Sequence, residues 1–228
     1  MGNQPEDPKI VIMKNGPYVV TGNVPLSENV ITPKGKGYVL TVGRDLPQSR
    51  EYALCRCGKS RNKPFCDGTH ETAGFTGTET ASRDKYVDRA GLLEGPGIDL
   101  LDDNRCAFSR FCHSEHGNTW QLVENSDRPG YTEEAIRTAS DCIAGRLVAV
   151  DKTGKLLEPS YEPSIEIIQD PQEGVSAGIF VKGNIPIESS DGRTYEIQNR
   201  VALCRCGKSR NKPFCDATHV TVKFSDKK

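Results

Sequence analysis

Two runs of the chain place cysteine and histidine at spacings that suit metal ligands. Residues 55–70 and 204–219 both follow the pattern Cys-x-Cys-x8-Cys-x3-His, and they differ only where Gly68 becomes Ala217. The flanking sequences have diverged much further, and retention of this kind is what ligand geometry demands. The candidate ligands are Cys55, Cys57, Cys66 and His70 in the first array, and Cys204, Cys206, Cys215 and His219 in the second.

Three thiolates and one imidazole can form a closed tetrahedral zinc site, which is the simplest interpretation of each array. Structural zinc sites usually pair cysteines two to four residues apart, whereas one residue separates Cys55 from Cys57. Ligands this close together suit one iron of a cluster, with Cys66 and His70 on the other iron. The spacing therefore favours an iron-sulfur cluster over zinc.

Each array ends in Lys-Pro-Phe-Cys-Asp-Gly-Thr-His or its Ala217 variant, and this ending resembles that of the CDGSH, or NEET, iron-sulfur proteins. The resemblance implies that each set of three cysteines and one histidine binds one [2Fe-2S] cluster. We expect Asp67 and Asp216 to be N-caps of a short helix that bears the histidine. If the family glycine has a positive φ, Ala217 adds strain and weakens the second site.

Basic residues surround each array, as Lys59, Arg61 and Lys63 do in the first. Three thiolates on an oxidised two-iron core leave a formally negative site. The basic residues therefore either compensate this charge locally or form a docking rim for an acidic redox partner.

The remaining cysteines, Cys106, Cys112 and Cys142, lie between the arrays. They are either buried structural cysteines or ligands of a third cluster. Their spacing resembles a ferredoxin module in which Ser109 replaces the middle cysteine, and similar divergent single-cluster modules occur fused to CDGSH motifs. Phe108 and Ile143 depart from that pattern, where histidine and proline are usual. Three thiolates match a [3Fe-4S] cluster, while a [4Fe-4S] cluster needs a fourth ligand, for which the candidates are Ser109, His113, His116 or water; we expect both histidines to be surface residues instead.

The composition bounds the partners and the compartment. The 228 residues are 35% hydrophobic and carry a formal net charge of −1, which argues against a nucleic-acid or membrane-surface binder and favours a protein partner. The nine cysteines are expected to be metal or redox ligands in the cytoplasm rather than disulfides. The polar start of the chain predicts no secretory signal, and Glu6 occupies the position where an N-myristoylation motif needs Ser or Thr.

The sequence around the arrays predicts short strands and one clear helix. Thr132 begins a segment with an acidic first turn and an apolar face, which predicts a helix over residues 132–142. Residues 151–171, rich in Pro, Glu and Ser, look like a connector. Expected strands are residues 10–13, 38–42, 51–54, 147–150, 179–182, 195–197 and 201–203.

These elements predict a β-rich α+β protein with three parts. Residues 1–88 and 156–228 form two small CDGSH β-modules, and residues 89–155 form a ferredoxin-like module inserted between them. In related proteins two CDGSH units pair as a dimer, so here the copies are expected to pair within one chain as a pseudo-dimer, compatible with a monomer. Such small modules have thin cores, and bound metal supplies folding energy.

The leading hypothesis is a redox protein that transfers or senses electrons through two [2Fe-2S] clusters and a third cluster. No substrate or nucleotide site is recognised, so we do not expect an enzyme. One alternative is a carrier that donates clusters to apo iron-sulfur proteins. The other is a zinc-stabilised interaction scaffold, which would be colourless.

Overall fold

The structure, a computed structural model, describes residues 7–226. In these residues the protein is a small, β-rich α+β protein with few helices, all of them short. The expectations about secretion and N-myristoylation rest on residues 1–7. Of these, only Asp7 belongs to the described residues. No helix among residues 7–226 has the length and apolar character needed to cross a membrane.

The first four-stranded sheet combines strands from both repeats. Its order is β14-β1-β2-β5. Strand β2 runs antiparallel to both β1 and β5, whereas β1 and β14 run parallel, with Ile10 opposite Ile187. The edge strand β14 therefore comes from the second repeat. The strands are β1 (Lys9–Ile12), β2 (Tyr18–Thr21), β5 (Tyr52–Leu54) and β14 (Ile187–Glu188).

The five-stranded sheet repeats this exchange in the opposite direction. Its order is β15-β13-β12-β3-β4, and β3 of the first repeat pairs in parallel with β12 of the second, with Leu26 opposite Ile165. Buried residues of both repeats form one hydrophobic core between the sheets. The strands are β3 (Leu26–Lys34), β4 (Gly37–Val42), β12 (Ser164–Asp170), β13 (Val175–Lys182) and β15 (Arg200–Leu203).

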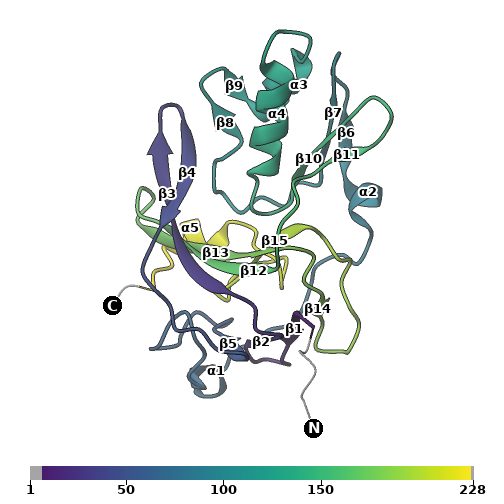
Figure 1. Cartoon of the computed structure of the whole chain (residues 1–228). Coiled ribbons are helices and arrows are strands. Elements are labelled where there is room, and N and C mark those ends of the chain that lie inside the picture. The colour runs from purple at the N-terminus through teal and green to yellow at the C-terminus, as the bar shows by residue number, and fades with distance from the viewer. Residues whose placement is uncertain (1–6, 227–228) are drawn as a thin grey trace.

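The segment between the repeats forms a separate lobe, at the top of Figure 1. Its antiparallel sheet has the order β11-β10-β7-β6, and α3 and α4 pack against it through their own hydrophobic core. Helix α2 (Tyr86–Arg89) leads into the lobe. Its strands and helices are β6 (Gly91–Leu93), β7 (Asp99–Asp102), β8 (His113–Ser114), β9 (Gly117–Asn118), α3 (Thr119–Glu124), α4 (Tyr131–Ser140), β10 (Leu147–Val150) and β11 (Leu156–Leu157).

Most predicted elements are confirmed within a residue or two, including the helix at α4 and the strand at β10. Two predictions are wrong. Residues 195–197 form no strand, because pairing with β14 is limited to the bridge between Glu188 and Thr194 and the bond from the Tyr195 N–H to the Ile187 carbonyl. The expected connector at 151–171 contains β12, whose Ile165 and Ile167 are fully buried in the shared core.

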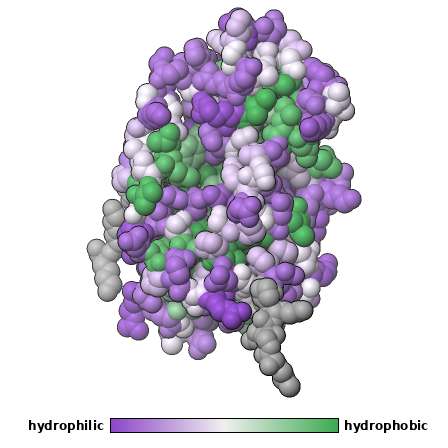
Figure 2. Space-filling view, in the orientation of Figure 1, coloured by the Kyte–Doolittle hydropathy of each residue, from purple (hydrophilic) through white to green (hydrophobic). Residues whose placement is uncertain are grey.

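The face in Figure 2 is mostly polar, and the buried apolar side chains form separate clusters. Polar side chains dominate the face in Figure 2, and apolar side chains occur there in separate patches. The apolar side chains that pack together are instead distributed among the shared core of the repeats, the core of the middle lobe and a third cluster between them.

Candidate metal centres

In each repeat a strand ends directly at the first cysteine. Strand β5 stops at Leu54 and β15 at Leu203, one residue before Cys55 and Cys204. The chain then loops back, so that the amide of Cys66 donates to the carbonyl of Ala53 at 2.8 Å and the amide of Cys215 donates to that of Ala202 at 2.8 Å. The loop is therefore fastened to its own strand, which brings the third cysteine beside the first two. The peptide bonds before Pro64 and Pro213 are cis.

The four ligands of each array lie as two pairs. The sulfurs of Cys55 and Cys57 are 3.7 Å apart, and the sulfur of Cys66 lies 3.4 Å from Nδ1 of His70. The second array repeats this arrangement, at 3.6 Å for its first two cysteines and 3.4 Å between Cys215 and His219. Among residues 7–226, no group of three or more His, Cys, Asp or Glu side chains surrounds one point as a single metal ion requires.

A four-residue helix presents each histidine: α1 (Thr69–Thr72) and α5 (Thr218–Thr221). The predicted N-caps are off by one residue, because the N-cap positions are Gly68 and Ala217, in left-handed conformation at φ 82° and 66°. The prediction of strain at Ala217 depended on a positive φ at this position, and the structure has one.

The aspartates before these positions tie the loop to the helix. Oδ1 of Asp67 accepts the amide of Thr69 at 3.1 Å, and Oδ2 accepts the amide of Arg61 at 2.9 Å. Asp216 accepts the amides of Thr218 and Arg210 at the same distances. Both bonds need a carboxylate, and together they fix the ligand-bearing loop against the helix that bears the histidine.

In each array the environment favours the thiolate of the first cysteine. The pKa of the others is raised, by the hydrogen-bonded neighbouring cysteine at Cys57 and Cys206 and by burial at Cys66 and Cys215. The amide of Lys59 donates to the sulfur of Cys57 at 3.3 Å. The hydrogen bond from the Cys57 thiol, helped by backbone N–H groups of the loop, lowers the pKa of Cys55, and the same arrangement lowers that of Cys204. Burial lowers the pKa of His219 to about 4, so its imidazole is neutral at neutral pH. Thiolate and neutral imidazole are the metal-binding forms of these groups.

The two arrays differ in their exposure. Cys215 and His219 are 3% and 2% exposed, so the second site is closed off from solvent. In the first site Cys66 is only half-buried, and the His70 side chain is 16% exposed. A partner molecule can therefore approach the first site far more closely than the second.

The ligand loops of the two arrays touch each other. A Cβ at Gly58 would lie 2.6 Å from the carbonyl oxygen of Cys206, and one at Gly207 would lie 2.5 Å from that of Cys57. Both glycines also have positive φ, at 72° and 75°. Only glycine satisfies both conditions, and its use here allows the backbones of the two sites to meet.

The residue between the first two cysteines of each array is a buried arginine, a feature that hydropathy alone does not predict. Arg56 donates to the carbonyls of Met13 and Gly16 and bonds that of Gly77. Arg205 donates to Ala177 and Ile168 carbonyls and pairs with Asp226. Each arginine thereby fixes its Cys-x-Cys turn to the first hairpin of its repeat and to the segment after its histidine.

The middle lobe brings together the three remaining cysteines. Burial, followed by the neighbouring charges of Cys142 and Cys106, raises the pKa of Cys112 to about 11. The amide of Phe108 donates to the sulfur of Cys106 at 3.3 Å, and backbone N–H groups of residues 144, 146 and 147 face Cys142. Phe108 and Arg110 have positive φ, which marks a tightly wound loop around the triad.

The candidate fourth ligands differ in placement. Ser109 is buried within the loop that bears Cys106 and Cys112. His113 is exposed, and exposed His116 lies with Nδ1 2.6 Å from Glu134. The structure thus places both histidines at the surface, as expected, and leaves Ser109 or water as candidates.

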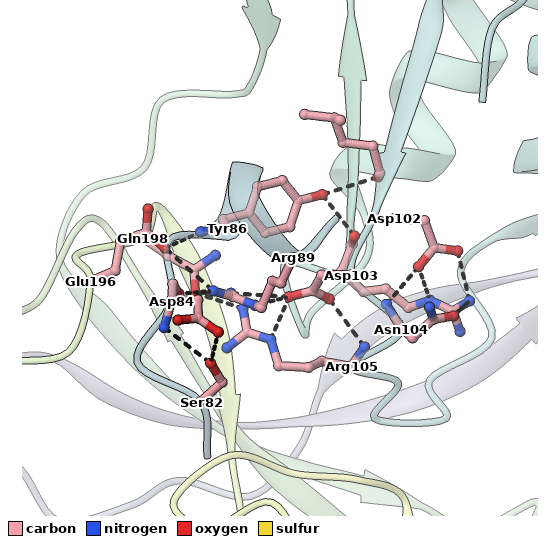
Figure 3. Close-up of polar contacts among 12 residues, drawn as sticks. Ser82, Asp84, Tyr86, Arg89, Asp102, Asp103, Asn104, Arg105, Glu196 and Gln198 are labelled. Carbon is pink, nitrogen blue, oxygen red and sulfur yellow. Dashed lines mark hydrogen bonds and ion pairs between the residues drawn. The ribbon is translucent and has the colours of Figure 1, made fainter. Parts of the chain in front are cut away.

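A network of charged side chains positions the start of this loop (Figure 3). Asp103 accepts hydrogen bonds from Arg89 and Arg105, and Arg105 also bonds Gln198 at 2.6 Å. Next to it, Asp102 pairs with Arg146, and the Arg146 side chain also interacts with Cys106. The network joins α2, the middle lobe and the segment before β15, directly ahead of Cys106.

The middle triad lies against the second array. Buried Arg200 of β15 donates to the carbonyls of Ala139, Cys142 and Leu147. Cys215 belongs to the same hydrophobic cluster as residues 107 and 111, which neighbour Cys106 and Cys112 in sequence. Burial raises the pKa of Cys215, and the nearby charge of Cys106 contributes to the rise.

Comparison with protein families identifies the arrays. Residues 15–71 and 177–220 each match the family model described as iron-binding zinc finger CDGSH type. Both arrays fall inside these ranges, and residues 91–157 of the middle lobe lie between them. No curated protein and no solved structure matches the chain. The protein therefore carries two CDGSH-type iron-binding segments, and an iron-sulfur protein of redox or cluster-transfer type is the class that these segments indicate.

Proposed function

We propose that the protein is a non-catalytic iron-sulfur redox protein that binds two [2Fe-2S] clusters and a third cluster, [3Fe-4S] or [4Fe-4S]. The observation that carries the proposal is the division of each Cys3His array into two ligand pairs. A mononuclear zinc site needs four ligands around one point, whereas a two-iron cluster needs two ligands on each iron. Cys55 and Cys57 would hold one iron of the first cluster, and Cys66 and His70 the other.

The donor set and its surroundings fit such a cluster. Backbone N–H groups directed at the ligand sulfurs favour thiolates and tune the potential of a bound cluster. In both sites Nδ1 of the histidine faces the third cysteine. The cluster would supply one-electron storage, and the loop residues would hold and shield it.

Strand exchange between the repeats supports the pseudo-dimer that the family resemblance implies. Each repeat supplies a parallel partner to a strand of the other: β14 pairs with β1, and β3 pairs with β12. Neither copy completes its sheet alone. The two sites are thus held at one fixed separation, as electron exchange between them requires.

The middle triad supports a third cluster and an order of sites. Three cysteines match a [3Fe-4S] cluster, in keeping with the resemblance to ferredoxin modules, and the charges of Cys106 and Cys142 act on Cys112. The charge of Cys106 contributes to the raised pKa of Cys215, and the loops of Cys57 and Cys206 touch. The three ligand sets therefore form one contiguous series. We place the exposed first site at the end of the series that meets a partner.

Metal and sulfide analysis tests this proposal. The protein is purified without oxygen, iron, sulfide and zinc are quantified, and EPR spectra are recorded before and after dithionite. Roughly seven irons and an oxidised-state signal from a [3Fe-4S] centre are expected, and Cys112→Ala should remove that signal alone. Four irons would make the middle triad structural, and zinc without colour would overturn the proposal.

Cluster donation is the second candidate function, and the exposure of His70 and Cys66 favours it. Here the partner is an apo iron-sulfur protein rather than a redox protein. Incubation with an apo-ferredoxin separates the two. Transfer of iron and colour to the acceptor supports donation, whereas re-oxidation by a partner without loss of iron supports electron transfer. In either case we propose a cytoplasmic protein with no nucleic-acid or membrane partner.

A further inference from the structure

The loops at residues 59–63 and 208–212 have the same sequence, Lys-Ser-Arg-Asn-Lys, but different surroundings. We name them the first and second cluster loops. Their identity makes them a matched pair, because any difference in what contacts them comes from the rest of the fold. The two loops differ in what contacts their outer side, next to the exposed Arg61 or Arg210.

A segment without regular secondary structure covers the second cluster loop. The amides of Thr80 and Ala81 both donate to the carbonyl of Lys212, at 2.8 and 3.0 Å, and the Thr80 hydroxyl donates to the carbonyl of Arg210 at 2.7 Å. Glu79, directly before them, is held by Ser190 and Tyr195. Residues 79–81 therefore form an acidic clip on the loop backbone.

The first cluster loop borders a cavity instead. Lys59, Arg61 and Lys63 line a cavity of about 650 Å³ that also reaches Gln169 and Asp226. The carbonyl of Lys63, equivalent to that of Lys212, receives a 3.4 Å contact from Arg44. The related cavity beside the second repeat, about 510 Å³, is lined by residues 76–81 and not by the second cluster loop. Among residues 7–226, no comparable clip covers the first cluster loop.

The cavity rim is basic. Lys59, Arg61 and Lys63 contribute positive charge at its edge, whereas Arg44 is paired with Glu28. The acidic groups of its floor are engaged within the protein, since Glu28 binds Arg44 and Gln169, and Asp226 binds Arg205. An occupant that approaches from solvent therefore meets positive charge first.

We propose that the first cluster loop is the docking site for an acidic segment of a partner protein. Its backbone amides would bond to the Lys63 carbonyl and a hydroxyl to that of Arg61, as Thr80 and Ala81 do on the second loop. A Glu-Thr-Ala-like segment has this chemistry. Docking there places the partner on the loop between Cys57 and Cys66, which belongs to the more accessible of the two sites. The docking site deepens the proposed function by specifying the partner, and it rests on that function.

Binding of a labelled peptide with the sequence of residues 76–82 to the full iron-loaded chain tests the inference. We expect one binding site by fluorescence anisotropy, and cross-links from a photoreactive group in the peptide to residues 59–63. Arg61→Ala should weaken binding at least about threefold, because a rim charge is lost. Arg210→Ala is the matched control and should leave affinity unchanged, since both side chains are about nine-tenths exposed and each lies 3.8 Å from its aspartate.

A peptide with Gln in place of Glu should also bind more weakly. Absence of binding at millimolar peptide, equal effects of the two arginine variants, or cross-links outside the first loop would overturn the inference. Visible absorption of the same samples reports separately whether the clusters are present. A coloured protein that ignores the peptide therefore contradicts the docking site alone, and a colourless one contradicts the proposed function.

Discussion

The hydroxyl of Tyr18 donates a 2.8 Å hydrogen bond to the carbonyl oxygen of Cys204, 186 positions later in the sequence. The same hydroxyl lies 3.0 Å from the carbonyl of Pro213. Tyr18 is fully buried on β2 of the first repeat, yet it holds the ligand loop of the second. At the equivalent position of the second repeat stands Ile179, which has no hydroxyl to donate. The support between the repeats is therefore one-sided.

Tyr18→Phe should weaken the second site selectively. The change leaves two buried carbonyls without this donor and should cost about 1–2 kcal/mol. We expect faster thermal loss of one cluster, followed by visible circular dichroism, with the other unchanged. Tyr52→Phe is the control, because it removes a similar buried bond, to the Val24 carbonyl at 3.0 Å, away from the ligand loops. Equal behaviour of both variants would contradict a local role for Tyr18.

Exchanging the residues that precede the two histidine helices should change stability in opposite directions. Ala217 has φ 66°, a conformation that costs an L-residue about 1 kcal/mol, so Ala217→Gly should stabilise the second site. Gly68→Ala should destabilise the first site by a similar amount. A Cβ at Gly68 would meet nothing within 4 Å, so this cost comes from the backbone alone. Thermal midpoints of cluster loss test both changes, and shifts of the same sign would refute the argument.

Iron removal from the two proposed [2Fe-2S] sites by a chelator should proceed in two phases. The first site is reached through half-buried Cys66 and His70, whereas Cys215 and His219 are almost completely enclosed. We expect Cys66→Ser to abolish the fast phase and Cys215→Ser to abolish a slow one. The absorbance decay of each variant measures this directly. A single phase of unchanged rate in all three proteins would show that exposure does not control iron loss.

The sequence predicted the parts that depend on local pattern. Strands that stop at Cys55 and Cys204 carry β-branched or aromatic residues, and α4 has an acidic first turn and an apolar face. These signals act over a few residues and need no knowledge of the rest of the fold. The candidate ligands were identifiable for the same reason, because each array repeats as a unit.

Relationships between distant segments were beyond this kind of prediction. The pairing of β3 with β12 joins residues about 140 positions apart, as Leu26 with Ile165 shows, and no local pattern specifies a parallel partner. Burial of Arg56 and Arg205 opposes their hydropathy and is possible only because distant carbonyls accept their hydrogen bonds. The sequence offered one clue, since an arginine lies between the paired cysteines in both repeats. The exposed Arg61 and Arg210 are repeated in the same way, so repetition alone does not show which arginines are buried.

Acid should weaken the attachment of the second Cys-x-Cys turn through Asp226. Burial alone would raise the pKa of this carboxyl, but the charge of Arg205 and hydrogen bonds from Arg205, Ser176 and Gln169 outweigh it and lower the pKa to about 2. A depressed pKa means that the carboxylate stabilises the fold above its ordinary pKa of 3.8, and that this contribution is lost as the pH falls towards 2.

Asp226→Asn should therefore destabilise the protein by about 2 kcal/mol at neutral pH and flatten the fall in stability between about pH 4 and pH 2. Denaturant unfolding at several pH values measures both effects. Asp191→Asn is a suitable control, because Asp191 also pairs with an arginine, Arg193, but at an exposed surface where the pair contributes little. If both variants follow the wild-type pH profile, the buried pair of Asp226 and Arg205 does not stabilise the second site, and the turn between Cys204 and Cys206 is held by the carbonyl contacts of Arg205 alone.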